Sequence, residues 1–199
     1  MRLLLPFVLA LLLIPDPARD FAELEAGLLE AETLEIPFHV TAKGAVTVDI
    51  RGQLNVRPDS TSLTGVGTFA GRPVDVFLHA GSETMTWGNA DTTMTAPRAP
   101  HLNEALIVGL TRMGILHNLA RLTGAAPPDH ADGGVSDWVT LAGFRADSTG
   151  IGFDITVSNV PSGTATLTTD PSGHLTERHQ RVDFPTGTMH VHERYTNPD

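Results

Sequence analysis

The sequence predicts a mainly β domain: an antiparallel meander that one helix precedes and a second, long apolar helix interrupts. Apolar and polar residues alternate over many segments, which is typical of strands with one face on the core. Short turn sequences rich in Gly, Pro and Asp separate these segments. Two other segments repeat their apolar residues at three- to four-residue spacing, as helices do. No internal repeat or low-complexity linker divides the chain, so one domain is expected over 20–199.

The 199 residues have the composition of a folded, acidic protein. The hydrophobic content is 41%, the charged content 18% and the formal net charge -10 at pH 7. This length allows one well-packed domain and is short for two. No cluster of lysine or arginine interrupts the acidity, so neither nucleic acid nor an anionic membrane surface is an expected partner.

Residues 1–19 have the form of a secretory signal. One positive charge precedes an apolar run from Leu3 to Ile14, which is shorter than the roughly 20 residues of a transmembrane helix. Export with cleavage is expected, without stable membrane insertion afterwards; a retained anchor is the alternative. Because the sequence has no cysteine, disulfides, thiolate catalysis and a lipidated N-terminal cysteine are not expected. A periplasmic or extracellular location follows.

The first helix is expected over 20–35. Asp20 is a suitable N-cap, Phe21 and Leu24 begin an apolar stripe, and Pro37 ends the helix. The opposite, glutamate-rich face should be solvated. From residue 46 to 56 the period changes to two, which predicts a long strand or a bent pair.

The next segment predicts a hairpin that turns at Gly71 and Arg72, with Phe69 opposite Val74. This register brings Gly65 and Gly67 to the inner face, among aliphatic residues. Glycine inside a strand often marks a bend, or space for another group to approach. Further short strands carry Met85, Trp87 and Met94.

The segment 104–122 predicts one long and unusually apolar helix. Asn103 is a suitable N-cap and Gly124 a suitable C-terminal stop. Its polar stripe is narrow and includes Thr111 and Asn118. Such a helix is either buried on most sides or covers something apolar.

Five strands are expected to follow, over 138–145, 151–160, 164–169, 174–184 and 188–195. The last two predict a hairpin with Phe184 opposite Met189 and His179 opposite Arg194. A slip of one residue would pair apolar with polar side chains throughout, so the choice of faces is well determined.

This register places His190 and His192 on the outer face, opposite Asp183 and Arg181 respectively. The two histidines with Asp183 would offer three metal ligands. However, Arg181 and Arg194 add positive charge there and no other strong ligand is evident. A solvated polar face is therefore expected, with a metal site as the minor alternative, and no cofactor is expected.

Other motifs do not predict an active site. There is no G-x-S-x-G segment, and "HLTERH" has neither the order nor the spacing of a zinc protease motif. "GVGTFAG" lies in a hairpin rather than between a strand and a helix, and "DHADGG" lacks the spacing of an EF-hand. A non-catalytic protein is expected.

Three segments in this order of elements resemble the periplasmic lipoprotein-carrier family of the LolA/LolB type. They are "GQLNVRPD", "HAGSETMTW" and the closing meander "LTTDPSGHLTERHQRVDFPTGTMHVHERY". The resemblance covers most of the chain after residue 19. It implies a half-open antiparallel β-barrel with an apolar interior, a helical lid over it and an acyl chain in the hollow.

In that family the arginine of the Arg-Pro element holds the lid closed, a role that the resemblance would give to Arg57. Two departures bear on this role. Strict alternation after Val56 places Arg57 outward, and "DSTSL" stands where the family has an aromatic pair.

The predicted function is therefore a non-catalytic extracytoplasmic carrier or binding protein for a hydrophobic small molecule, such as an acyl chain or lipid, or for a lipidated protein. The alternatives are a solid core without a ligand, a periplasmic sensor or interaction domain on the same fold and, less expected, a histidine-dependent metal protein or enzyme. The predicted ligand-binding residues are Val48, Ile50, Leu54, Phe69, Val76, Leu78, Met85, Trp87, Leu106, Leu110, Met113, Phe153, Ile155, Met189 and Val191.

Overall fold

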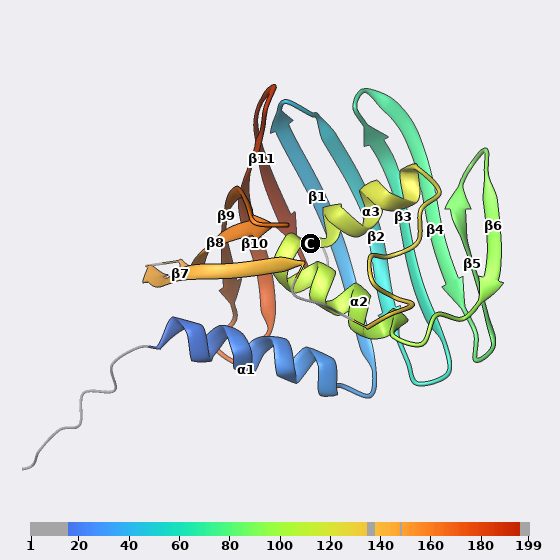
Figure 1. Cartoon of the computed structure of the whole chain (residues 1–199), viewed down its shortest axis with the longest axis horizontal. Helices are drawn as coiled ribbons and strands as arrows, with labels where there is room; N and C mark the ends of the chain where they lie inside the picture. Colours follow the sequence, from blue (N-terminus) through green and yellow to red (C-terminus); the bar gives the residue numbers. More distant parts are fainter. Residues whose placement is uncertain (1–15, 135–137, 148, 196–199) are drawn as a thin grey trace, which may run out of the picture.

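The computed structural model describes residues 16–134, 138–147 and 149–195, where eleven antiparallel strands form one sheet (Figure 1). Most of the predicted signal segment, residues 1–15, lies outside the described residues. The strands are β1 (Leu34–Gly44), β2 (Val48–Val56), β3 (Thr61–Phe69), β4 (Arg72–Ala80), β5 (Thr84–Asn89), β6 (Thr93–Pro97), β7 (Val139–Asp147), β8 (Gly150–Val157), β9 (Val160–Thr169), β10 (Leu175–Phe184) and β11 (Gly187–Arg194).

The strands follow the order β6-β5-β4-β3-β2-β1-β11-β10-β9-β8-β7. Two meanders thus meet where β1 pairs with β11. The outermost strands β6 and β7 are not paired with each other, so the sheet does not close into a complete barrel. The predicted class, a mainly β, half-open antiparallel barrel with helices, is confirmed.

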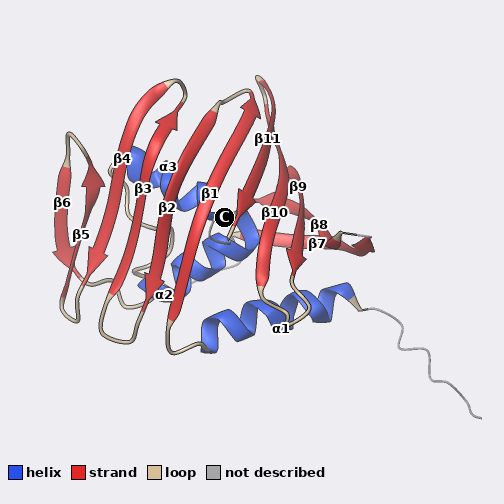
Figure 2. Ribbon diagram, turned by 180° about the vertical axis from the view of Figure 1, so that it is seen from behind, coloured by secondary structure: helices blue, strands red, loops and turns tan. Residues whose placement is uncertain are grey.

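The helices lie on one side of this sheet, as Figures 1 and 2 show from opposite directions. Helix α1 (Pro17–Glu30) contacts β7 and β8, while α3 (Ile115–Thr123) contacts β4 and β5. No helix in the described part of the chain is long and apolar enough to cross a membrane.

Helix α1 is shifted toward the N-terminus relative to the prediction. Asp16 is its N-cap and accepts a hydrogen bond from the Arg19 amide, 3.2 Å away; Asp20 lies in the first turn. The helix therefore begins within the segment assigned to the signal. It ends at Glu30, and Pro37 lies inside β1, opposite Gln53. The expected continuation to residue 35 was wrong because the two-residue period of β1 already begins at Leu34.

The β3–β4 hairpin is tighter than predicted. Phe69 pairs with Arg72, not with Val74, and the turn consists of Ala70 and Gly71. Both turn residues have positive φ, 51° and 75°, as in a two-residue turn whose twist matches that of the strands. The error is two residues, so every side chain keeps its predicted face.

The β10–β11 hairpin differs from the prediction in the same way. Phe184 pairs with Gly187, not with Met189, through another two-residue turn. The predicted faces are again correct but the partners are not. In particular, His179 lies directly opposite His192.

The predicted single helix 104–122 is divided into three parts. A Cβ at Gly114 would lie 2.6 Å from Glu193 Oε1, and the glycine has a φ of 89°, which L side chains rarely adopt. The chain therefore leaves the helix there, and the helical direction changes. The parts are α2 (Leu102–Val108), the π-helical turn η1 (Gly109–Met113) and α3 (Ile115–Thr123).

Helix α2 does not begin as predicted. His101 is its N-cap and makes no side-chain capping bond. Asn103 is the second residue of the helix, and its side-chain oxygen accepts hydrogen bonds from Thr61 and Arg98. The predicted stop is confirmed, because Gly124 is the C-cap of α3.

The core has two parts. The larger lies between α2, η1, α3 and the strands from β1 to β5, with β11, and includes the fully buried Leu54, Leu106 and Leu119. The smaller lies between α1 and strands β7 to β9, around Phe21 and Phe153. Both clusters are thus buried between the sheet and the helices.

Candidate functional site

An apolar cavity of about 340 Å³ lies between η1 and α3 on one side and β3, β10 and β11 on the other. This volume falls within the range of about 300–1,000 Å³ typical of small-molecule sites. Two polar residues, His117 and Gln180, are part of its lining. The other lining residues are Val46, Phe69, Met113, Leu116, Ala120, Val182, Phe184, Met189 and Val191.

The cavity has a buried floor and a partly exposed rim. Leu116, Met189 and Val191 are buried, whereas Met113 is half-buried and Phe184 is 41% exposed. Single apolar side chains are common on protein surfaces, whereas an exposed phenylalanine at the edge of an apolar cavity is typical of a binding site. The two methionines add side chains that adapt readily to different shapes. The arrangement suits an apolar ligand that enters past Phe184.

A buried arginine of β10 holds η1, which forms part of the cavity wall, against the sheet. Arg178 is fully buried on the inner face of the sheet, where its Nε donates to Gln180 Oε1 at 3.0 Å. Its two terminal nitrogens donate to the carbonyl oxygens of Thr111 (2.7 Å) and Arg112 (2.8 Å). Carbonyls at the end of a helical segment attract a cation. Arg178 therefore ties the end of η1 to the sheet.

A buried glutamate of β11 fixes the start of α3. The Glu193 carboxylate accepts hydrogen bonds from the amides of Ile115 (3.0 Å) and Leu116 (2.9 Å), and from the Tyr195 hydroxyl. A carboxylate at a helix N-terminus satisfies free amides and complements the helix dipole. The sheet thus holds both sides of the break at Gly114.

The ionisation of this network reflects its burial. Burial raises the pKa of Glu193, against the charge of Arg178 and the hydrogen bonds that the carboxylate accepts, which lower it. Burial also raises the pKa of Tyr195 well above its usual value, and the Glu193 charge raises it further. Burial lowers the pKa of Arg178, while the charge of Glu193 opposes this. The charge of each partner therefore supports that of the other.

Helix α1 is hydrogen-bonded to η1, beside the carbonyl groups that Arg178 contacts. Glu25 of α1 accepts hydrogen bonds from Thr111 Oγ1 at 2.6 Å and from Arg112 Nη2 at 2.7 Å. Glu25 is buried, so the expectation of a fully solvated glutamate face was wrong. The polar stripe of the predicted long helix is likewise buried at Thr111 and at Asn118, whose amide donates to the Leu106 carbonyl. These polar groups are internal contacts of a broken helix.

Four of the fifteen predicted ligand-binding residues line the apolar cavity: Phe69, Met113, Met189 and Val191. The other eleven are buried in the two core clusters. Phe153 and Ile155 belong to the smaller one. The larger one includes Val48, Ile50, Leu54, Val76, Leu78, Met85, Trp87, Leu106 and Leu110.

Arg57 directly follows the last residue of β2. Its side chain is exposed and donates to Glu35 Oε1 at 2.9 Å. The side chains that join the sheet to the helical break are Arg178 and Glu193, which the sequence analysis missed. The alternation that placed Val182 and Val191 inward also places Arg178 and Glu193 inward, and it was the available signal.

Comparisons with known proteins show no family. No family model and no curated protein matches the chain. Among solved structures, the crystal structure of LprF from Mycobacterium bovis is similar at a TM-score of 0.37 and 11% sequence identity, over 94% of this chain and 95% of that chain. At that TM-score the likeness carries no argument about function.

Proposed function

We propose that the protein is a non-catalytic, extracytoplasmic binding or carrier protein whose ligand is an acyl chain, bound in the apolar cavity. The observation that supports this most directly is the cavity lining, which is almost entirely apolar and passes from buried Met189 to exposed Phe184. The extracytoplasmic location rests on the signal-like character of residues 1–19.

The energetics favour an apolar ligand. Protein interiors are close-packed, and voids much larger than a water molecule are few. A cavity lined in this way offers water few hydrogen bonds, whereas each methylene moved into it gains about 0.8 kcal/mol. A short section of an acyl chain would fill the cavity beside Leu116 and Val191 while its polar head remains at the rim.

The helical break forms part of the wall of the site. Met113 and Leu116, which flank Gly114, both line the cavity, and Arg178 and Glu193 attach this part of the chain to the sheet. A bound acyl chain would therefore contact the helical break from both sides of Gly114.

Filling the cavity tests this function. Ala120→Phe adds a large side chain to the lining, and binding of a fluorescent fatty acid should weaken at least about tenfold, or about 1.4 kcal/mol. Ala26→Phe on the exposed side of α1 is the matched control and should bind as the wild type does. Circular dichroism checks that both variants fold.

Competition with an unlabelled fatty acid and with an acylated peptide separates the two ligand classes. Displacement by the free acid alone indicates a lipid carrier, and preferential displacement by the peptide indicates a lipoprotein carrier. If the wild type binds no probe, or folded Ala120→Phe binds it normally, the cavity is not an acyl site.

A further inference from the structure

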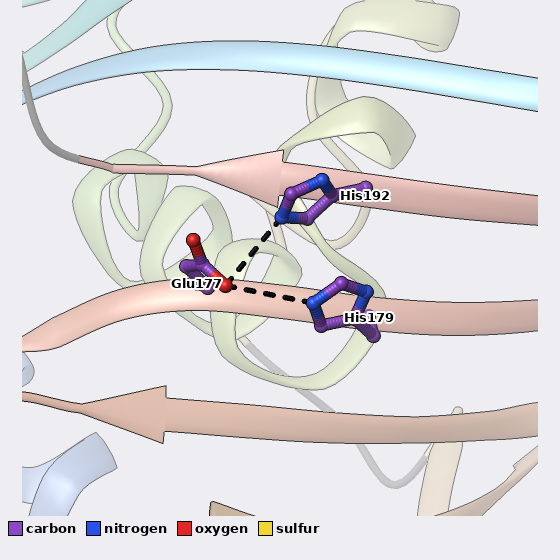
Figure 3. A group of neighbouring side chains, drawn as sticks. All are labelled: Glu177, His179 and His192. Carbon is purple, nitrogen blue, oxygen red and sulfur yellow. Dashed lines mark ion pairs between the residues drawn. The ribbon is translucent and has the colours of Figure 1, made fainter. Parts of the chain in front are cut away.

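A second group of side chains lies on the opposite, outer face of the sheet, where β10 and β11 pair. Glu177 and His179 are alternate residues of β10 and therefore point to the same side. The hairpin register places His192 of β11 directly opposite His179, where the sequence analysis had wrongly placed Arg194. We call Glu177, His179 and His192 the histidine cluster (Figure 3).

The three side chains converge. The two imidazole rings are stacked, with centroids 4.2 Å apart and planes inclined by 11°. Glu177 Oε2 lies 3.5 Å from Nε2 of His179 and 3.5 Å from Nε2 of His192. Figure 3 shows one nitrogen of each ring, Nε2, on the side that faces the carboxylate. One potential ligand atom from each residue lies within 4.8 Å of the others.

The carboxylate-to-imidazole distances are longer than direct hydrogen bonds and match the spacing of two ligands of one ion, and the stacked rings must turn before both Nε2 lone pairs point at that ion. A charge-assisted N–H···O bond is about 2.7–2.9 Å long, well below 3.5 Å. Two ligands of a tetrahedral zinc ion, each about 2.0–2.1 Å from the metal, lie about 3.4 Å apart. In addition, Nε2 of His192 is buried and has no hydrogen-bond partner among residues 16–134, 138–147 and 149–195. A metal ion would satisfy this nitrogen.

The charge state of the cluster is compatible with a metal. A histidine ligand must be neutral. Burial lowers the pKa of His192 and the neighbouring His179 lowers it further, against the Glu177 carboxylate, which raises it. Glu177 supplies one negative charge toward the ion.

Nearby cations oppose binding and limit its strength. Arg194 lies opposite Glu177 and also lowers the pKa of His192; its guanidinium contacts His39 Nδ1 at 3.2 Å. Arg181, two residues along β10, is paired with Asp183 at 3.0 Å, so part of its charge is compensated. The balance predicts a moderate, exchangeable site.

We propose that the histidine cluster binds one divalent first-row transition-metal ion, with two imidazoles and one carboxylate as protein ligands. Imidazole favours Zn²⁺, Cu²⁺ and Ni²⁺ over Mg²⁺ and Ca²⁺, which prefer oxygen ligands. Three protein ligands leave a position open to water or to a group from another molecule. The site lies on the outer face of the sheet and is independent of the apolar cavity.

Zinc titration of the chelator-treated full chain tests this proposal by calorimetry, with native mass spectrometry for stoichiometry. One ion should bind per chain. His179→Gln, His192→Gln and Glu177→Gln each remove a ligand, so the dissociation constant should rise by at least about tenfold, since even outer partners of metal ligands contribute 10–100-fold.

His190→Gln is the matched control, because His190 is an exposed histidine of the same strand and face but lies outside the cluster. It should bind zinc with unchanged affinity. Thermal unfolding without metal verifies that all four variants are folded. Absence of a stoichiometric ion in the wild type, or equal weakening by His190→Gln, would overturn the proposal.

Discussion

Replacing Glu193 by Gln tests whether the buried network holds the helical break in place. The change keeps the shape of the side chain but removes its negative charge. The glutamine oxygen can still accept from one of the two amides, Ile115 or Leu116, but its NH₂ group, a donor, replaces the acceptor of the other. The fully buried Arg178 also loses the charge that supports its own ionisation.

The expected loss follows from these contacts. Hydrogen bonds to a charged group are worth about 1.5–3 kcal/mol each, and leaving a buried charge such as Arg178 uncompensated costs about 3–5 kcal/mol. The two figures describe overlapping interactions and do not add. We therefore expect a loss of about 3–5 kcal/mol in the free energy of unfolding. At about 2–4 °C per kcal/mol for a domain of this size, Tm should fall by roughly 6–20 °C.

Urea unfolding followed by circular dichroism measures this loss. Glu35→Gln is the matched control: its carboxylate pairs with Arg57 on the surface, so the change should stay within about 0.5 kcal/mol. In a double-mutant cycle, Arg178→Met combined with Glu193→Gln should cost less than the sum of the single changes, with a coupling energy of about 1 kcal/mol or more. A Glu193→Gln variant as stable as Glu35→Gln would refute the reasoning.

Two further predictions concern the ligand site and export. Leu110→Asp should unfold the domain, because this fully buried side chain belongs to the larger core and an unpaired carboxylate there is very costly; Met113→Asp at the half-buried rim should keep the circular dichroism spectrum and lose acyl-probe binding. Unfolding of both variants would mean that the rim is ordinary core. N-terminal sequencing of protein from its host should find that Met1 is absent, and an intact Met1 on cytosolic protein would contradict export.

The hydropathy pattern was sufficient to predict which face of β2, β3, β4, β10 and β11 is buried, whereas β1 was not predicted as a strand. Phe69 and Phe184 were each paired two residues too far, yet the faces remained correct, because a shift by an even number does not change the side of the sheet. The turn geometry determines the partners. Positive φ at Ala70 and Gly71 allows a two-residue turn that hydropathy does not reveal.

The candidate sites required information that is not local in sequence. The apolar period continues through 104–122, so it predicts one helix; the break at Gly114 depends on Glu193, which is distant along the chain. The histidine cluster similarly depends on the partner of His179. The predicted register was wrong by two residues. It left the core prediction intact but placed Arg194 opposite His179, where the structure has His192.

The positions of Arg178 and Glu193 indicate what these buried charges contribute to the helical break at Gly114. A buried charged pair is a weak source of stability, since apolar residues of similar volume often serve equally well. Arg178 and Glu193 nevertheless occupy the inner face of the sheet, and each makes two hydrogen bonds to the backbone beside Gly114, besides one to a neighbouring side chain. Such bonds specify where a helix ends and where the next begins, which apolar packing does not. We infer that the network positions η1 and α3 over the apolar cavity, and that its contribution is to geometry more than to overall stability.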